Sequence, residues 1–231
     1  MLVTMGAVEF VSERAGDLHI PDGFVSAPVA VGGWLVAALA VGIAVRRVDR
    51  RLEERAVPLM GVMAAFLFAA QMVHFPVAGG TSGHLLGGVL AAILLGPWAA
   101  ILVMTAVIGL QSLLFQDGGL LAIGLNVTNM GVLAVLIGTT IYGGAQRLGA
   151  HGGGLVVATF MAAWLSVVVA AGATALQLGS SGTSALEVAL PGLVGVYMLI
   201  GIGEGLITLG ALGLIRSARP DLVVDPVWKG P

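Results

Sequence analysis

Long apolar stretches without charged residues alternate with short charged or glycine-rich breaks along this chain. The first such stretch covers residues 23–45 and ends at Arg46 and Arg47. Because about 20 apolar residues are needed to cross the roughly 30 Å hydrocarbon core of a bilayer, this stretch predicts a transmembrane helix. Three later stretches have the same character and predict helices over residues 124–144, 155–176 and 188–215.

The longest uncharged stretch, residues 56–116, is too long for two membrane spans and their connecting turns. It is interrupted by Pro76, Gly79, Gly80 and Pro97, and proline and glycine are the strongest breaks in a helical pattern. These breaks predict three helices, over residues 57–75, 81–96 and 98–115, which brings the total to seven. The middle one is short and rich in glycine, so a re-entrant hairpin is the alternative there.

Positive charge favours the arrangement with seven spans. Of the 10 Lys and Arg residues, five lie within residues 46–55, and three others are Arg147, Arg216 and Arg219. Cytoplasmic loops of membrane proteins carry an excess of such residues. If residues 81–96 cross the membrane, all three basic regions fall on one side. We therefore predict an outer N-terminus and a cytoplasmic C-terminus.

The composition agrees with an all-α membrane protein. Hydrophobic residues make up 58% of the chain and charged residues only 10%, which is far from the usual mix of a soluble domain. We expect one polytopic transmembrane domain over residues 18–231, preceded by a segment of different character at residues 1–17. The sequence contains no cysteine, which excludes disulfides and thiolate metal ligands.

Side chains that can bind a metal gather at the predicted outer ends of the helices. His19 precedes the first helix, and His84 lies in the outer turn of the third. Neutral imidazole is a common ligand of nickel, cobalt, copper and zinc, and polar residues buried among membrane spans are functional candidates. The alternative for both residues is ordinary hydrogen bonding at the membrane interface. The same side carries His74, a weaker ligand candidate, and Asp22, Asp117, Asn126 and Asn129, whereas His151 is expected in a cytoplasmic loop.

Four segments of the chain resemble one family of transport proteins in their order and spacing. They read "HIPDGF", "FPVAGGTSGHLLGG", "LLFQDGGLLAIGLNVTNMG" and "IGIGEGLIT". Together they resemble the CbiM/NikM family, the substrate-capture (S) components of energy-coupling-factor (ECF) transporters for nickel and cobalt. The resemblance runs from residue 18 to about residue 215.

The resemblance implies a metal site built from nitrogen atoms. In the family the chain opens with Met-His-Ile-Pro-Asp-Gly, and the free amine, the backbone nitrogen of the histidine and its imidazole chelate the metal. These groups match Leu18 and His19, and a second histidine matching His84 completes a nearly square-planar set, which suits Ni(II). Supporting hydrogen bonds around such ligands are expected from Asp22, Ser82, Asp117, Asn126 and Asn129.

This sequence departs from the family pattern at its beginning. Leu18 stands where the family has its initiator methionine, and the segment "MLVTMGAVEFVSERAGD" precedes it. Three explanations are open: a cleaved signal peptide, a genuine extension, or a mis-assigned start at a leucine codon that is translated as methionine. The acidic residues of the segment and its lack of a basic beginning and of a long apolar core argue against a signal peptide. We favour the mis-assigned start.

The resemblance also implies partners. The transported substrate would be Ni(2+) or Co(2+), and energy would come from other subunits, because the sequence contains no phosphate-cradling loop. The implied partners are a transmembrane coupling (T) protein, two cytosolic ATPase subunits and a small auxiliary membrane protein, all at the cell membrane and with no role for nucleic acid.

Other functions remain as alternatives. Gly80-Thr81-Ser82-Gly83 matches the nucleophile motif of rhomboid proteases, although a serine nucleophile needs a base within hydrogen-bond reach. An S component for a vitamin or another organic ligand, and a channel, are further possibilities. Glu204 lies in the middle of a predicted span, where a carboxylate needs a partner, so we expect it to contact another span or the coupling protein.

Overall fold

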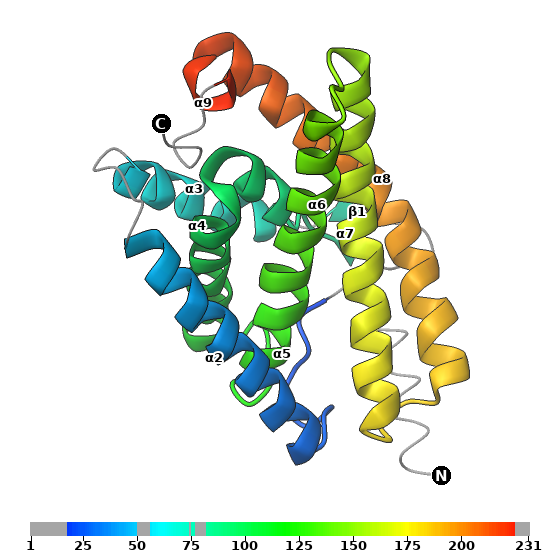
Figure 1. Ribbon diagram of the computed structural model, residues 1–231. Helices are drawn as coiled ribbons and strands as arrows, with labels where there is room; N and C mark the ends of the chain where they lie inside the picture. The colour runs from blue at the N-terminus through cyan, green and yellow to red at the C-terminus, as the bar shows by residue number, and fades with distance from the viewer. Residues whose placement is uncertain (1–17, 50–55, 74, 77–81, 225–231) are drawn as a thin grey trace.

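The computed structural model describes residues 18–49, 56–73, 75–76 and 82–224, and these form a bundle of helices (Figure 1). The helices are α2 (Ala27–Asp49), α3 (Ala56–Gln71), α4 (Gly88–Leu110), α5 (Ile123–Asn126), α6 (Ala134–Arg147), α7 (Gly153–Ser180), α8 (Leu186–Ala218) and α9 (Asp221–Val224). Two π-helical segments, η2 (Gln111–Phe115) and η3 (Val127–Leu133), continue α4 and α5. The short strands β1 (Phe75–Pro76) and β2 (Ser82–Gly83) pair antiparallel.

The prediction of an all-α membrane protein is confirmed. Five helical stretches are long and apolar enough to cross a membrane, and α3 is a shorter apolar helix. The five are Ala27–Val48, Gly88–Phe115, Ile123–Arg147, Gly153–Ser180 and Leu186–Ala218. Four of them contain most of the spans predicted at residues 23–45, 124–144, 155–176 and 188–215, with ends that differ by a few residues.

The middle of the chain departs from the predicted boundaries. The helices predicted over residues 81–96 and 98–115 form one continuous element, α4 followed by η2, with a kink at Gly96 (φ 77°, ψ 168°). Gly96 can adopt this positive φ because it has no Cβ, and the following Pro97 has no N–H to donate to the preceding turn. Residues 84–87 are not helical, so the segment becomes a helix only at Gly88. The break was expected at the right place, but the chain bends there instead of leaving the helix.

The arrangement in space has α4 at its centre. Its membrane-spanning stretch is the most buried of the five, whereas most of α2 is exposed. Helices α7 and α8 pack against each other along one side of the bundle, and the blue α2 lies on the opposite side (Figure 1). The segment before α2 enters the bundle near α5 instead of running along its surface (Figure 1).

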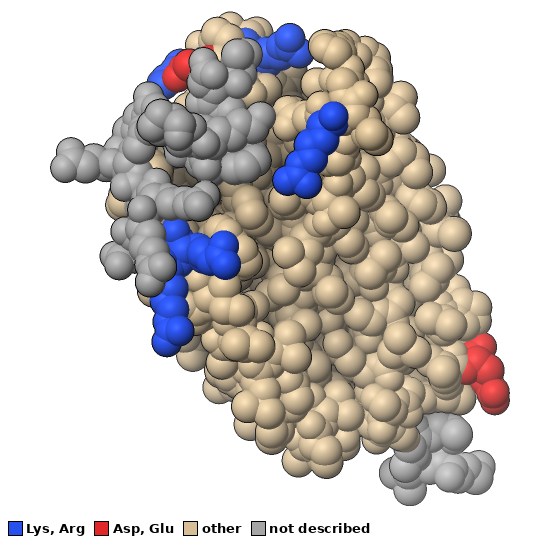
Figure 2. Space-filling model, viewed as in Figure 1, with Lys and Arg blue, Asp and Glu red and all other residues tan. Residues whose placement is uncertain are grey.

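Basic side chains gather towards one end of the bundle. Figure 2 shows Lys and Arg gathered towards one end of the visible face, with a broad uncharged region beyond them. The guanidinium of Arg47 lies 5.4 Å from the centre of the Trp98 ring, so the end of α2 contacts α4 just beyond its kink. This separation of charge fits the positive-inside rule, and the orientation of the termini stays a prediction.

Helices α2 and α5 approach closely because each has a glycine at the contact. A Cβ atom on Gly124 would lie 2.5 Å from the backbone nitrogen of Trp34. A Cβ atom on Gly33 would lie 2.9 Å from the backbone nitrogen of Leu125. Small residues at such contacts allow the backbones of membrane helices to pack together. This contact fixes α5, and therefore the residues around it, against α2.

Replacing Gly33 with alanine tests this contact. We expect Gly33→Ala to lower the free energy of unfolding by about 1–3 kcal/mol, because the added methyl group overpacks the helix contact. Gly32→Ala is the matched control, since a Cβ atom at Gly32 meets nothing within 4 Å. Thermal unfolding of both variants in detergent measures the difference. Equal melting temperatures for the two variants would contradict the close approach.

Candidate metal centre

Residues 18–22 form an irregular segment whose first three residues lie inside the helix bundle. Leu18, His19 and Ile20 are at most 2% exposed. The N–H of Ile20 donates to Oδ1 of Asn126 (2.9 Å), and its carbonyl accepts from the N–H of Gly119 (2.9 Å) and from Nδ2 of Asn126 (3.2 Å). Irregular backbone at membrane depth is tolerated only where the protein satisfies its polar groups. Asn126, expected as a supporting residue, therefore holds the backbone of this segment.

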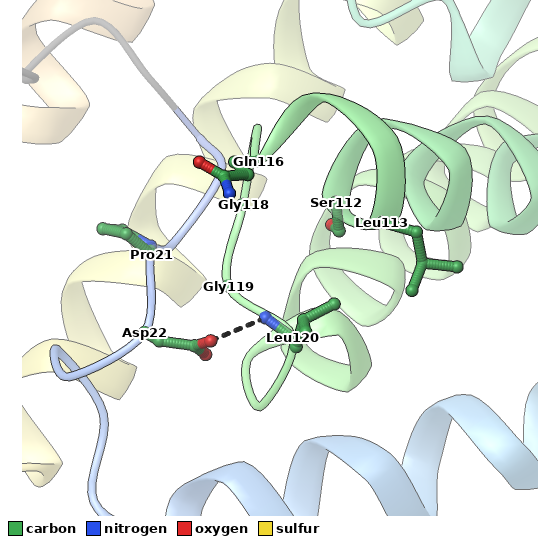
Figure 3. A pocket seen from close by; sticks show the side chains of 8 residues that line it. All are labelled: Pro21, Asp22, Ser112, Leu113, Gln116, Gly118, Gly119 and Leu120. Atoms are coloured by element: carbon green, nitrogen blue, oxygen red, sulfur yellow. Dashed lines mark hydrogen bonds between the residues drawn. The ribbon is translucent and has the colours of Figure 1, made fainter.

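Asp22 fastens the other end of the segment to the loop after η2. Its carboxylate accepts the N–H groups of Leu120 (2.9 Å) and Leu121 (2.8 Å), as Figure 3 shows for Leu120. A Cβ atom on Gly119 would collide with Asp22. Gly118 has a φ of +96°, and a Cβ atom there would lie 3.5 Å from Cβ of His19. The Asp-Gly-Gly turn is thus shaped by contact with residues 18–22.

A pocket of about 290 Å³ opens beside this turn. Pro21 and Asp22 line it on one side, and Ser112, Gln116 and the glycines of the turn line it on the other (Figure 3). Gln116 adopts a left-handed conformation with φ 56° at the end of η2, which turns the chain into the loop. The pocket therefore lies next to the buried His19, on the side of the Asp-Gly-Gly turn.

The structure brings His19 and His84 side by side. Their ring centroids are 5.3 Å apart, the ring planes are tilted by 33°, and both residues are buried. Nε2 of His19 lies 3.2 Å from Oε1 of Gln111, and its Nδ1 lies 3.5 Å from Oδ1 of Asp117. Nδ1 of His84 lies 3.0 Å from the carbonyl of Leu85. Two imidazoles and one carboxylate from segments far apart in the sequence thus converge.

The loop that carries His84 is held by Glu204 from α8. The N–H groups of Leu86 and Gly87 donate to the two carboxylate oxygens at 2.7 Å and 2.8 Å. Glu204 therefore satisfies the backbone of the two residues that precede α4, and these two donors account for a buried carboxylate within a span. Of the two roles expected for it, the structure shows a contact with another part of the bundle.

Two buried amides near the histidines were missed in the sequence. Nε2 of Gln71 donates to the carbonyl of Leu86 (2.7 Å), and Nε2 of Gln111 donates to Oε1 of Gln71 (2.8 Å). Neither glutamine is exposed. Polar side chains within apolar helices are functional candidates. The two amides in the uncharged stretch of residues 56–116 were therefore the sequence feature that could have identified these residues.

The other expected site residues lie elsewhere or outside the described part of the chain. Asn129 donates to Gln177 (2.8 Å) and to Thr174 (3.1 Å), so it joins η3 to α7. His151 is exposed in the loop between α6 and α7. Leu18 is buried and is the first described residue. His74 lies outside the described residues, and of Ser82 only the backbone, in β2, is described.

The donor set of this site is incomplete if side chains alone are counted. Among the described residues, no group of three His, Asp, Glu or Cys side chains is placed to hold a metal ion. The site offers two imidazoles, the partly buried carboxylate of Asp117 and the backbone of residues 18–20. A transition metal bound here would have to take further donors from backbone nitrogen.

Comparison with known proteins gives consistent matches. A putative metal transport protein of Haloquadratum walsbyi is 42% identical over 208 residues, which cover 89% of this chain and 93% of that protein. A putative fused nickel transport protein NikMN of Archaeoglobus fulgidus is 36% identical over 215 residues, which cover 92% of this chain and 70% of that protein. A cobalt transport protein CbiM of Geobacter sulfurreducens is 34% identical over 216 residues, which cover 89% and 61%.

The fold also matches a solved structure. The crystal structure of a truncated transition metal transporter superposes with a TM-score of 0.78 at 30% identity and covers 87% of this chain and 99% of that chain. The family model for CbiM, described as the cobalt uptake substrate-specific transmembrane region, matches residues 19–222, which include both buried histidines and Glu204. This chain is therefore a multi-pass membrane protein that belongs to the CbiM family.

Proposed function

We propose that this protein captures Ni(II) or Co(II) at its outer side and delivers the ion across the cell membrane as the substrate-binding subunit of an ECF-type transporter. The observation that carries the proposal is the pairing of His19 with His84 inside the bundle, 5.3 Å apart. Two buried imidazoles beside a carboxylate form a suitable site for a borderline-soft divalent cation.

The proposed ligands are nitrogen atoms of three residues. A chelate formed by the backbone nitrogen and the imidazole of one histidine closes a six-membered ring through Nδ1, because Nε2 points away from the backbone. In His19, Nε2 faces Gln111, which leaves Nδ1 for the metal. The imidazole of His84 and the amine of residue 18, as the true first residue, complete four nitrogens. Such a set suits square-planar Ni(II) better than tetrahedral Zn(II).

The charge around the site supports binding of a cation. Asp117 lies 3.5 Å from His19, and its Oδ2 is buried without a hydrogen-bond partner among the described residues. A buried carboxylate oxygen without a partner is costly, and a divalent cation nearby would offset that cost. The pocket beside residues 21 and 22 offers an approach from outside.

Release of the ion requires partners. The relative from Archaeoglobus fulgidus is named a fused nickel transport protein, which supports cooperation between this subunit and a second membrane component. We propose a transmembrane coupling protein, two cytosolic ATPases and a small auxiliary membrane protein as those partners. ATP binding would then reorient this subunit, and the segment of residues 18–22 would have to loosen to release the ion.

Removal of either buried histidine tests the proposed ligands. We expect His19→Ala and His84→Ala each to weaken Ni(II) binding by more than about 100-fold, because loss of a ligand should exceed the 10–100-fold cost of losing a supporting residue. His151→Ala, in the exposed loop, is the matched control and should bind like the unaltered protein. Calorimetric titration of purified protein in detergent gives the affinities. Unchanged binding in both variants would exclude this site.

The start of the chain provides a second test. Protein produced to begin with methionine in place of Leu18 should bind one Ni(II) tightly, since its amine can complete the chelate. Protein that begins at Met1 offers an amide nitrogen at residue 18 and should bind more weakly. Intact mass of protein from the native host shows which form exists, and titration compares their affinities. Equal affinities would mean that the amine is not a ligand.

Replacement of Asp22 tests whether the segment of residues 18–22 must be held in place for tight binding. Asp22→Ala removes two charge-assisted hydrogen bonds to the loop after η2, each worth about 1.5–3 kcal/mol, so we expect a lower melting temperature and faster release of Ni(II). Glu187→Ala is the control, because Glu187 is an exposed acid in the first turn of α8, worth at most about 1 kcal/mol there. Equal effects of the two substitutions would argue that Asp22 does not hold residues 18–22 in place.

A further inference from the structure

A directed chain of hydrogen bonds runs from a backbone carbonyl to the ring of His19. Gln71 lies at the end of α3, and Gln111 lies at the start of η2. The carbonyl of Leu86 can only accept a hydrogen bond, so the group of Gln71 that faces it at 2.7 Å must be the NH₂. Oε1 of Gln71 therefore accepts from the NH₂ of Gln111 at 2.8 Å. Oε1 of Gln111 is then the atom that faces Nε2 of His19 at 3.2 Å.

This order has a consequence for the imidazole. Because Oε1 of Gln111 is an acceptor, Nε2 of His19 must carry the hydrogen, and in the neutral ring Nδ1 then has the lone pair. We propose that Gln71 and Gln111 are positioning residues that hold His19 as the Nε2–H tautomer and so direct its Nδ1 to the metal. The inference rests on the proposed function, in which Nδ1 closes the chelate ring, and adds residues that act through His19 without touching the ion.

Asp117 explains why such a relay is needed. Its Oδ1 lies 3.5 Å from Nδ1 of His19, and a carboxylate at that distance favours a hydrogen on Nδ1. Gln111 and Asp117 therefore favour opposite tautomers of this ring. With Gln111 as acceptor, the hydrogen stays on Nε2, and the negative charge of Asp117 then favours a metal ion at Nδ1. Without Gln111 as acceptor, the Nδ1–H tautomer would prevail, and its hydrogen would occupy the lone-pair position at which Nδ1 binds the metal.

The relay also links the two segments that carry the histidines. Its first member, the carbonyl of Leu86, belongs to a residue two positions after His84, and the N–H of the same residue is held by Glu204. The amides are buried, so breaking one bond leaves a polar group without a partner in a low-dielectric interior, which is costly. The orientation of His19 therefore depends on the loop of His84 being in place.

The tautomer can be measured without metal. In protein labelled with ¹⁵N-histidine and kept in detergent, long-range ¹H–¹⁵N correlation spectra distinguish Nε2–H from Nδ1–H rings, and loss of a signal in His19→Ala assigns His19. We expect the Nε2–H form in the unaltered protein. In Gln111→Met the ring should change to the Nδ1–H form, and Ni(II) affinity should fall by about 10–100-fold, as for other supporting residues of metal ligands. Gln71→Met, which lies one bond farther away, should shift the ring in the same direction.

A matched control separates this effect from a general loss of packing. Gln177→Met removes a partly buried, hydrogen-bonded amide that pairs with Asn129 and not with the relay, and should leave both tautomer and affinity unchanged. An Nδ1–H ring in the unaltered protein would overturn the inference even if the variants do not fold. An Nε2–H tautomer that persists in both Gln71→Met and Gln111→Met would also overturn the inference. Failure of the unaltered protein to bind Ni(II) would instead reject the proposed function, since the tautomer is read without metal.

Discussion

Backbone that is not helical cannot lie within a bilayer unless the protein supplies partners for its polar groups. Residues 18–22 meet this condition by running into the bundle, where Asn126 holds both polar groups of Ile20 and Asp22 fastens the segment to the next loop. The glycine pair after Asp117 follows from the same constraint, because a Cβ atom on Gly119 would collide with Asp22 and one on Gly118 would crowd Asn126, which holds the segment. The site therefore depends on contact between residues 18–22 and the loop after η2.

The two π-helical segments lie next to this arrangement. Extra residues in a helical turn are often found at functional sites, because they redirect side chains. Gln111 begins η2 and faces His19, while Asn129 lies within η3 and reaches α7. Two pairs of amides therefore connect helical segments through hydrogen bonds, Gln71 with Gln111 and Asn129 with Gln177. Inside a protein, an amide that loses its partner is costly.

Much of the fold follows from the sequence, because apolar length specifies four of the spans. The break between residues 96 and 98 was predicted at the right place, but the structure has a kink there within one continuous helical element and not two separate helices. The approach of His19 to His84 was also expected, but from resemblance to a family and not from spacing. Gln71 and Gln111 escaped notice because hydropathy averages over a window and hides single amides. Asn129 was grouped with the histidines, although its partners on α7 lie more than 40 residues away in sequence, a pairing that no local pattern reveals.

Glu204 attaches the loop of His84 to α8, although His84 and α8 are far apart in the sequence. In the chain, His84 precedes α4, yet two charge-assisted bonds join the following residues to the middle of α8. On α8, the neighbouring Ile202 and Leu206 are 46% and 60% exposed, so this helix has one side on the loop and another open to its surroundings. Through Glu204, a displacement of α8 would therefore act on the loop of His84. Residues 18–22, the other side of the site, are instead held by Asn126 of α5.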